Sequence, residues 1–171
     1  MKLVFAPDFP ALDAVADKTD NWTVRENWVS ALVKGVAVLI KRNTVTDGMS
    51  VPRITWRVMG HPFSKATLRE SLAHDALYMG ELLSRSACDR WYYDALVMSG
   101  TQFGGGFKNN VKAAAWRAKC ALIWSGVRAG GGVVWARHTH DSVDLARAKV
   151  RLLDSAEYAA LKTTAGHGNN G

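Results

Sequence analysis

The sequence predicts a mainly α-helical fold with a small N-terminal β ribbon. Two observations predict this fold class. Helical patterns with cap residues at their ends fill most of the chain between residues 64 and 161. The two patterns that predict the β ribbon lie before residue 42. At 171 residues the chain is expected to be a single domain. Its parts are a core at 21–100, a basic helical extension at 101–161 and a disordered tail at 162–171.

The N-terminal segments predict the ribbon. Residues 1–20 contain two prolines and four aspartates and are expected to form an extended lead-in. Residues 21–29 alternate in polarity and predict a strand, and the apolar residues 35–41 predict its partner. Residues 43–52 have the composition of a loop with a tight turn. A short helix is expected to begin at Pro52 and to end near Gly60.

Two neighbouring segments then predict a pair of antiparallel helices. Residues 64–80 carry an apolar stripe between a candidate N-cap, Ser64, and Gly80. Residues 85–99 are predicted to form the second helix, with Ser84 as its N-cap and Gly100 just past its end.

The C-terminal part predicts more helix. Residues 110–127 form a third long helical pattern, between glycine-rich joints at 101–107 and 130–132. Residues 133–136 are expected to form a short strand. Residues 141–161 are expected to form one helix that begins at an aspartate cap.

Titratable side chains concentrate on the two neighbouring helices. His74, Asp75 and Tyr78 lie on the first helix and Asp89 on the second. At about 1.5 Å rise per residue, His74 and Asp89 both lie roughly 8–9 Å from the connecting turn, so they can face each other. A carboxylate in that position holds one imidazole nitrogen and leaves the other as a base, with Tyr78 one turn further along the same face. The alternative is an ordinary polar stretch at the edge of a core.

The loop Asp47-Gly48-Met49-Ser50-Val51-Pro52 has oxygen ligands of the kind that calcium prefers. A carboxylate there stands beside backbone carbonyls that glycine exposes. Asp75 points about 100° away from His74 on its helix and would complete the shell if the loop packs against the helices. The residues predicted to bind calcium are therefore Asp47, Gly48 and Asp75. The alternative is a simple turn that leads into a helix.

The net charge of +7 originates in the C-terminal part. Residues 101–151 contain nine Lys or Arg against two Asp, which indicates an anionic partner or a solvated basic face. Trp116 and Trp124 share one face of the third helix, and Lys112 and Lys119 share another, as in helices that lie on anionic lipid. Core packing is the alternative for this helix. Binding of nucleic acid is a weaker hypothesis, because no recognisable module accompanies the charge.

Other features exclude some classes of protein. No apolar run has the length of a membrane span, and no signal peptide is expected at the N-terminus. Cys88 and Cys120 are expected to be free buried thiols in a reducing compartment. The segment His138-Thr139-His140-Asp141 offers three potential metal ligands, but it is typical of a surface turn and a helix cap.

Together the motifs resemble those of the phospholipase A2 superfamily. The resemblance lies in the Asp47–Pro52 loop, His74-Asp75-Ala76-Leu77-Tyr78 and Arg85-Ser86-Ala87-Cys88-Asp89. The chain is still more similar to a family of phage and prophage proteins, domain of unknown function 1353. The residues that carry this second resemblance, within residues 21–100, are Thr46–Arg53, Trp56, His74–Tyr78, and Asp89 with Trp91 and Tyr92.

The first resemblance implies a phospholipase A2-like helix hairpin core and a calcium-dependent hydrolase of lipid acyl esters. His74 would be the base, Asp89 its orienting partner and Tyr78 the support of Asp89, and Asp47 and Asp75 would bind calcium. The second resemblance implies a non-catalytic phage structural protein or host-protein-binding inhibitor with the same fold. The corresponding partners are an anionic lipid surface or a host or virion protein, and the expected location is the host cytoplasm or the virion.

Overall fold

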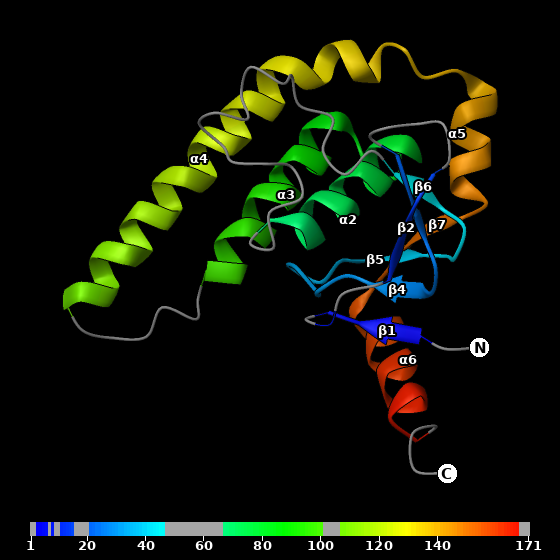
Figure 1. Cartoon of the computed structure of the whole chain (residues 1–171), viewed down its shortest axis with the longest axis horizontal. Helices are drawn as coiled ribbons and strands as arrows, with labels where there is room; N and C mark the ends of the chain where they lie inside the picture. The colour runs from blue at the N-terminus through cyan, green and yellow to red at the C-terminus, as the bar shows by residue number, and fades with distance from the viewer. Residues whose placement is uncertain are drawn as a thin grey trace.

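The computed structural model describes residues 3–6, 8, 11–15, 21–46, 67–100 and 107–167. The described strands are β1 (Leu3–Phe5), β2 (Leu12–Ala14), β3 (Trp22–Val24), β4 (Asn27–Val29), β5 (Ala37–Ile40), β6 (Val45–Thr46) and β7 (Val150–Leu153). The described helices are α2 (Leu68–Met79), α3 (Arg85–Ser99), α4 (Phe107–Trp135), α5 (His140–Arg147) and α6 (Ser155–His167). The prediction of a mainly α fold with a phospholipase A2-like hairpin core is therefore wrong. The fold is α+β with two sheets, and the larger sheet draws strands from both ends of the chain (Figure 1).

The larger sheet has the strand order β1-β4-β5-β7. β1 pairs parallel with β4, and the other two pairings are antiparallel. β7 pairs with β5 over its whole length, from Ala37 opposite Leu153 to Ile40 opposite Val150. The smaller sheet is antiparallel, with the order β2-β3-β6. The predicted strand at 35–41 is thus confirmed as β5. The one predicted at 21–29 is divided between β3 and β4, which belong to different sheets.

Alternation along the strands gives the larger sheet two apolar faces, and helices cover both of them. On one face, Val38 and Ile40 of β5 belong to the core cluster that α2 and α3 complete. On the other face, Ala37 of β5 and Leu153 of β7 pack with Tyr158 of α6. Figure 1 shows the sheet between α6 on one side and the α2–α3 pair on the other.

α4 packs along the outer side of α3 (Figure 1). The contact buries Tyr92 and Leu96 of α3 with Cys120, Ile123 and Val127 of α4. The three α4 residues are spaced three and four apart in the sequence, so they lie on one face of the helix, which faces α3. α4 extends the predicted third helix at both ends.

The glycine run at 130–132 lies inside α4, so the predicted flexible joint there is wrong. A Cβ on Gly131 would stand 2.5 Å from the hydroxyl oxygen of Tyr78, so this glycine allows α4 to approach α2 closely. Residues 133–135, expected to begin a strand, form the last turn of α4.

The predicted single helix at 141–161 is also wrong, because β7 interrupts it. α5 begins one residue earlier, after Thr139, whose hydroxyl accepts from the Ser142 N–H in a capping box. α6 begins after Asp154, which accepts from the Glu157 N–H (2.8 Å) while the Glu157 carboxylate accepts from the Asp154 N–H (3.2 Å). This second reciprocal cap is a sequence signature of a helix start, and it marks the break.

The ends of the other helices agree with the prediction to different degrees. α3 is confirmed with its bounds, and the Ser84 hydroxyl caps it. α2 starts at Leu68, four residues later than expected, and Ser64 lies outside the described residues. α6 continues to His167, into the tail expected to be disordered from residue 162. The predicted helix at 52–60 also lies outside the described residues. Across the described part of the chain, no helix has the length and apolar character needed to span a membrane.

Candidate active site

Asp89 of α3 is the centre of a buried polar cluster. Its carboxylate is completely buried and accepts hydrogen bonds from two other helices. One oxygen, Oδ1, accepts from the Tyr78 hydroxyl (2.5 Å) and lies 3.2 Å from Nε2 of His74, both on α2. The other oxygen, Oδ2, accepts from Nη1 of Arg128 on α4 (3.0 Å). The predicted pairing of His74 with Asp89, and the hydrogen bond expected from Tyr78, are thereby confirmed.

Aromatic rings hold the His74 imidazole in place. The Tyr92 ring stacks on it at 4.6 Å between centroids, and the Tyr78 ring lies tilted against it at 4.4 Å. The Tyr92 hydroxyl is itself within hydrogen-bond distance of the Ser71 hydroxyl (2.9 Å), one turn before His74. Trp135 of α4 packs edge-on against Tyr78. The imidazole therefore has little freedom to leave Asp89.

The hydrogen-bond partners determine the tautomer of His74. An ionised carboxylate only accepts, so Nε2 of His74 must carry the proton that it shares with Asp89. In the neutral imidazole Nδ1 is then unprotonated, and among the described residues it has no hydrogen-bond partner. This is the arrangement that a general base requires.

Burial and pairing shift the pKa values of the three side chains. Burial lowers the pKa of His74, and the bond to Asp89 offsets this only in part, so the imidazole is neutral at neutral pH. Burial opposes ionisation of Asp89, but the hydrogen bonds from His74, Tyr78 and Arg128 together outweigh it and lower its pKa. Burial and the adjacent Asp89 raise the pKa of Tyr78, which therefore stays a hydrogen-bond donor.

Arg128 and Gly131 belong to the cluster but were not predicted from the sequence. Both lie on α4, about 40 residues from Asp89, in a segment interpreted as a basic surface and a flexible joint. Arg128 also accepts, through its carbonyl, a hydrogen bond from Arg85 (3.2 Å). No local pattern marks either residue. Tyr92, by contrast, is one of the residues that carry the second family resemblance, and it follows Asp89 by three residues on the same helix.

The predicted calcium ligands are only partly described. Asp75 is buried, and its carboxylate accepts a short hydrogen bond from the Thr46 hydroxyl of β6. It does point to a different neighbour from His74, as expected. Asp47 and Gly48 lie outside the described residues. No group of three or more His, Cys, Asp or Glu side chains with metal-binding geometry occurs within the described part of the chain.

The face of α4 proposed for a partner is not exposed as expected. Trp116 is partly buried against α3, where its indole N–H donates to the Leu96 carbonyl (2.8 Å). Trp124 packs edge-on against Tyr93. Lys119 lies over the Trp116 ring, whereas Lys112 is exposed. The tryptophans therefore belong to the α3–α4 contact. The exposed side of α4 carries Lys112 and Arg117 among small and apolar residues, which include Val111 and Leu122.

Two further predictions concern isolated residues. Nδ1 of His138 lies 3.1 Å from the Glu81 carboxylate, and His140 is exposed at the start of α5, in agreement with a surface turn. The cap there is Thr139, not Asp141. Cys88 and Cys120 are free and buried, and burial raises their thiol pKa values to about 12 and about 11. Neither thiol is a reactive nucleophile at neutral pH.

Comparison with known proteins adds one finding. No curated protein and no solved structure shows a significant match to the chain. Residues 22–106 match the model of a family described as protein of unknown function, DUF1353. This segment runs from β3 through the end of α3 and contains His74, Tyr78 and Asp89, but not Arg128. Over just under half of its length, the chain is therefore similar to DUF1353, a family without an assigned function.

Proposed function

We propose that the protein is a hydrolase of acyl esters in which His74 acts as the general base. The observation that carries the proposal is the fixed His74–Asp89 pair, with the proton on Nε2 and a lone pair on Nδ1. A pKa below that of ordinary histidine keeps the base neutral at neutral pH. General bases with these properties typically accelerate reactions by about 10²–10⁴-fold.

In the proposed reaction, a water molecule donates a proton to Nδ1 of His74 as its oxygen attacks the acyl carbon. Asp89 stabilises the imidazolium that forms, and Tyr78 keeps the carboxylate in position. The tetrahedral intermediate collapses, the ester C–O bond breaks, and the leaving oxygen takes the proton from His74. The products are a carboxylic acid and an alcohol, and the enzyme returns to its starting state.

Calcium is the proposed cofactor, with Asp75 as the described ligand and Asp47 and Gly48 as its partners from the preceding loop. A bound calcium ion would stabilise the negative charge that develops on the acyl oxygen. Asp75 fits this role in its chemistry, because it is a buried carboxylate next to β6, where that loop begins. One carboxylate is fewer than the six to eight oxygens that calcium takes, so the ion needs the loop residues.

Calcium binding can be tested without an activity assay. If the site exists, calcium raises the melting temperature of the wild type and not of Asp75→Asn. The stabilisation follows mass action and is about 2.7 kcal/mol at a hundredfold excess over the Kd. Magnesium serves as the control cation. Equal shifts for both proteins would show that Asp75 is not a ligand.

The activity test compares three proteins on anionic phospholipid vesicles with calcium present. Wild type should release fatty acid, and His74→Gln and Asp89→Asn should lose about 10²-fold or more of the rate. Far-UV circular dichroism and melting curves establish that each variant is folded. Background release by all three proteins would contradict the hydrolase proposal.

A second candidate function is a non-catalytic protein of a phage that binds an anionic partner. The observation that favours it is Arg128, which neutralises Asp89 and joins a third helix to the cluster. In this view the polar cluster is a structural tie among α2, α3 and α4. Lys112 and Arg117, both exposed on α4, would contribute to the binding surface.

The second candidate requires a test that leaves the fold intact. Removal of residues 101–171 is unsuitable, because it would delete β7 from the larger sheet and uncover α3. Reversal of exposed charges with Lys112→Glu and Arg117→Glu changes the surface alone. Co-sedimentation with phosphatidylglycerol vesicles should decrease for the double variant and at higher salt. No binding by the wild type would exclude an anionic lipid surface as partner.

A further inference from the structure

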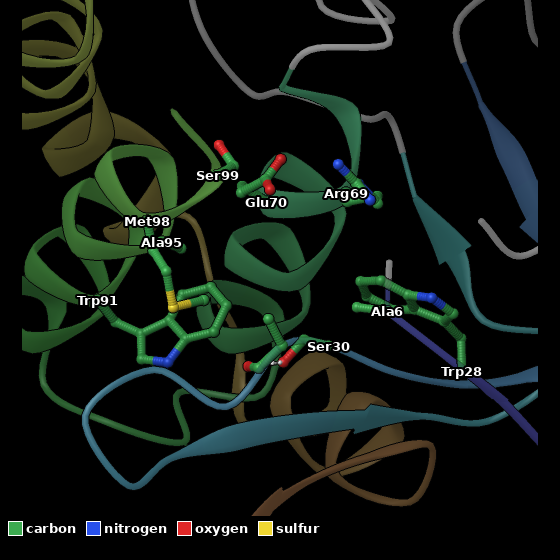
Figure 2. Close-up of a pocket in the computed structure, with 10 residues that line it drawn as sticks. Ala6, Trp28, Ser30, Arg69, Glu70, Trp91, Ala95, Met98 and Ser99 are labelled. Atoms are coloured by element: carbon green, nitrogen blue, oxygen red, sulfur yellow. Dashed lines mark hydrogen bonds between the residues drawn. The ribbon is translucent and has the colours of Figure 1, made fainter. Parts of the chain in front are cut away.

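α4 is an outer layer of the described structure. Its inner face packs on α3 through Cys120, Ile123 and Val127. Figure 2 shows another face of α3, which turns toward the larger sheet and lines a cavity of about 280 Å³ with it. α3 therefore lies between the sheet and α4, and Figure 1 shows α4 along the edge of the molecule. The opposite face of α4 is exposed along most of its length.

Three large apolar side chains stand on this outer face of α4. Val111, Leu122 and Val133 are 54%, 56% and 59% exposed. They follow one another at intervals of 11 residues, close to three helical turns, so they lie in one line about 33 Å long. The line is roughly 130° around the helix from the residues that contact α3. A surface helix normally turns polar residues outward, so a straight apolar line indicates a contact surface.

The residues between these three make the line symmetric about Leu122. Ala118 and Gly126 are each four residues from Leu122, and Ala115 and Ala129 are each seven. The two valines are each 11 residues away. Large and small side chains therefore occur in the same order from either end of the helix. An isologous two-fold interface needs this property, because residue i of one copy contacts residue j of the other and the reverse.

We propose that the protein forms a two-fold symmetric dimer through the outer faces of two antiparallel α4 helices. Leu122 meets the partner's Leu122 on the symmetry axis, and Val111 meets the partner's Val133. The smaller residues between these contacts let the two helix axes approach to about 8 Å. This inference does not depend on the hydrolase proposal.

The charges of α4 are compatible with this register. No Asp or Glu occurs between residues 107 and 140, so apolar contact and not ion pairing must hold the two helices together. Lys112 and Lys119 flank the apolar line, and the symmetric register places them opposite the partner's Gly132 and the partner's Ser125. Like charges are therefore not paired, and salt screens the repulsion that remains.

The area of the face is sufficient for a weak specific dimer. A helix is about 12 Å wide with its side chains, and a third of its solvent-accessible circumference over about 33 Å amounts to roughly 500 Å². Two copies bury about 1,000 Å² in total, which is the lower bound for a specific interface. A Kd on the order of 10 µM is therefore expected.

Sedimentation equilibrium of the full chain, from about 1 to 500 µM, measures the dimer. Leu122→Glu should raise the Kd by about 100-fold or more, because it places two unpaired carboxylates on the axis. Leu145→Glu is the matched control, since Leu145 is 69% exposed on α5, and it should associate like the wild type. Circular dichroism establishes that both variants are folded.

Cross-linking tests the register. Leu122→Cys should form a disulfide with its own copy on mild oxidation, because facing Cα atoms of closely packed helices lie within disulfide range. Val111→Cys alone should not, because the partner's Val111 lies about 33 Å away along the axis. A mixture of Val111→Cys and Val133→Cys should cross-link. The wild type, whose two cysteines are buried, gives the background on non-reducing gels.

Salt separates the dimer from an anionic partner on the same face. Dimerisation should persist or strengthen between about 0.05 and 0.5 M NaCl, whereas binding to an anionic lipid or an acidic protein weakens. A wild type that stays monomeric at 500 µM, or unchanged association of Leu122→Glu, would overturn the proposal. Cross-linking of Val111→Cys with itself would do the same, because it indicates a parallel pair. Binding of the face to phosphatidylglycerol vesicles without self-association would assign it to lipid instead.

Discussion

Asp89→Asn should destabilise the protein far more than Asp94→Asn, although both residues lie on α3. The Asp89 carboxylate is completely buried and accepts from His74, Tyr78 and Arg128. Asparagine keeps one acceptor oxygen and replaces the other with an N–H₂ donor. Whichever way the amide is oriented, it places a donor against at least one of the three donors.

The magnitude follows from the burial of each partner. Removal of one member of a buried ion pair costs about 3–5 kcal/mol. The Arg128 side chain is 36% exposed and can turn to solvent, so the lower end, about 3 kcal/mol, is expected for Asp89→Asn. For a chain of 171 residues this corresponds to a fall in Tm of about 6–12 °C. Asp94 pairs with Lys34 and Arg90, which are 69% and 62% exposed, so its loss should cost about 0–1 kcal/mol.

Urea denaturation followed by circular dichroism measures both free energies of unfolding. The difference between wild type and Asp89→Asn should also depend on pH. The pKa of Asp89 is lowered in the folded state, so its stabilising contribution is complete above the unfolded pKa of about 3.9. It is lost as the pH falls through the folded value, and the two stabilities should converge in acid. Equal destabilisation by Asp89→Asn and Asp94→Asn, or a constant difference at all pH values, would refute the reasoning.

Three further changes test other parts of the cluster. Gly131→Ala should lower the free energy of unfolding by about 1–3 kcal/mol, because its methyl group collides with the Tyr78 hydroxyl; unchanged stability in urea would contradict the close approach of α4. Arg128→Met should raise the pKa of His74, because Asp89 loses the arginine that partly neutralises it and so stabilises the imidazolium more strongly. NMR titration of the histidine signals measures this pKa, and an unchanged value would contradict the pairing of Arg128 with Asp89. The lowered pKa of His74 means that wild type loses stability as the pH falls from about 6.5 through the folded value, and His74→Gln should lose less over that window in calorimetry. Calorimetric curves with the same pH dependence for both proteins would be the contrary result.

The sequence by itself determined features that depend on neighbouring residues. α3 has its predicted bounds, because the Ser84 cap and Gly100 act within one turn of the helix ends. His74 meets Asp89 and Tyr78, because helical rise and spacing place them at one depth of two adjacent helices. Even the break between α5 and α6 had a local signal, in the reciprocal cap of Asp154 and Glu157.

Only the tertiary structure decided the fold class and the completion of the cluster. Val150–Leu153 becomes a strand because the exposed edge of β5, more than 100 residues earlier, supplies its hydrogen bonds. Gly131 remains helical because the packing of α4 against α2 outweighs its low helix propensity. The packing of α4 also places Arg128 within hydrogen-bond distance of Asp89. Such pairings join residues that no local pattern relates, because their free energy comes from contacts that exist only after the chain has folded.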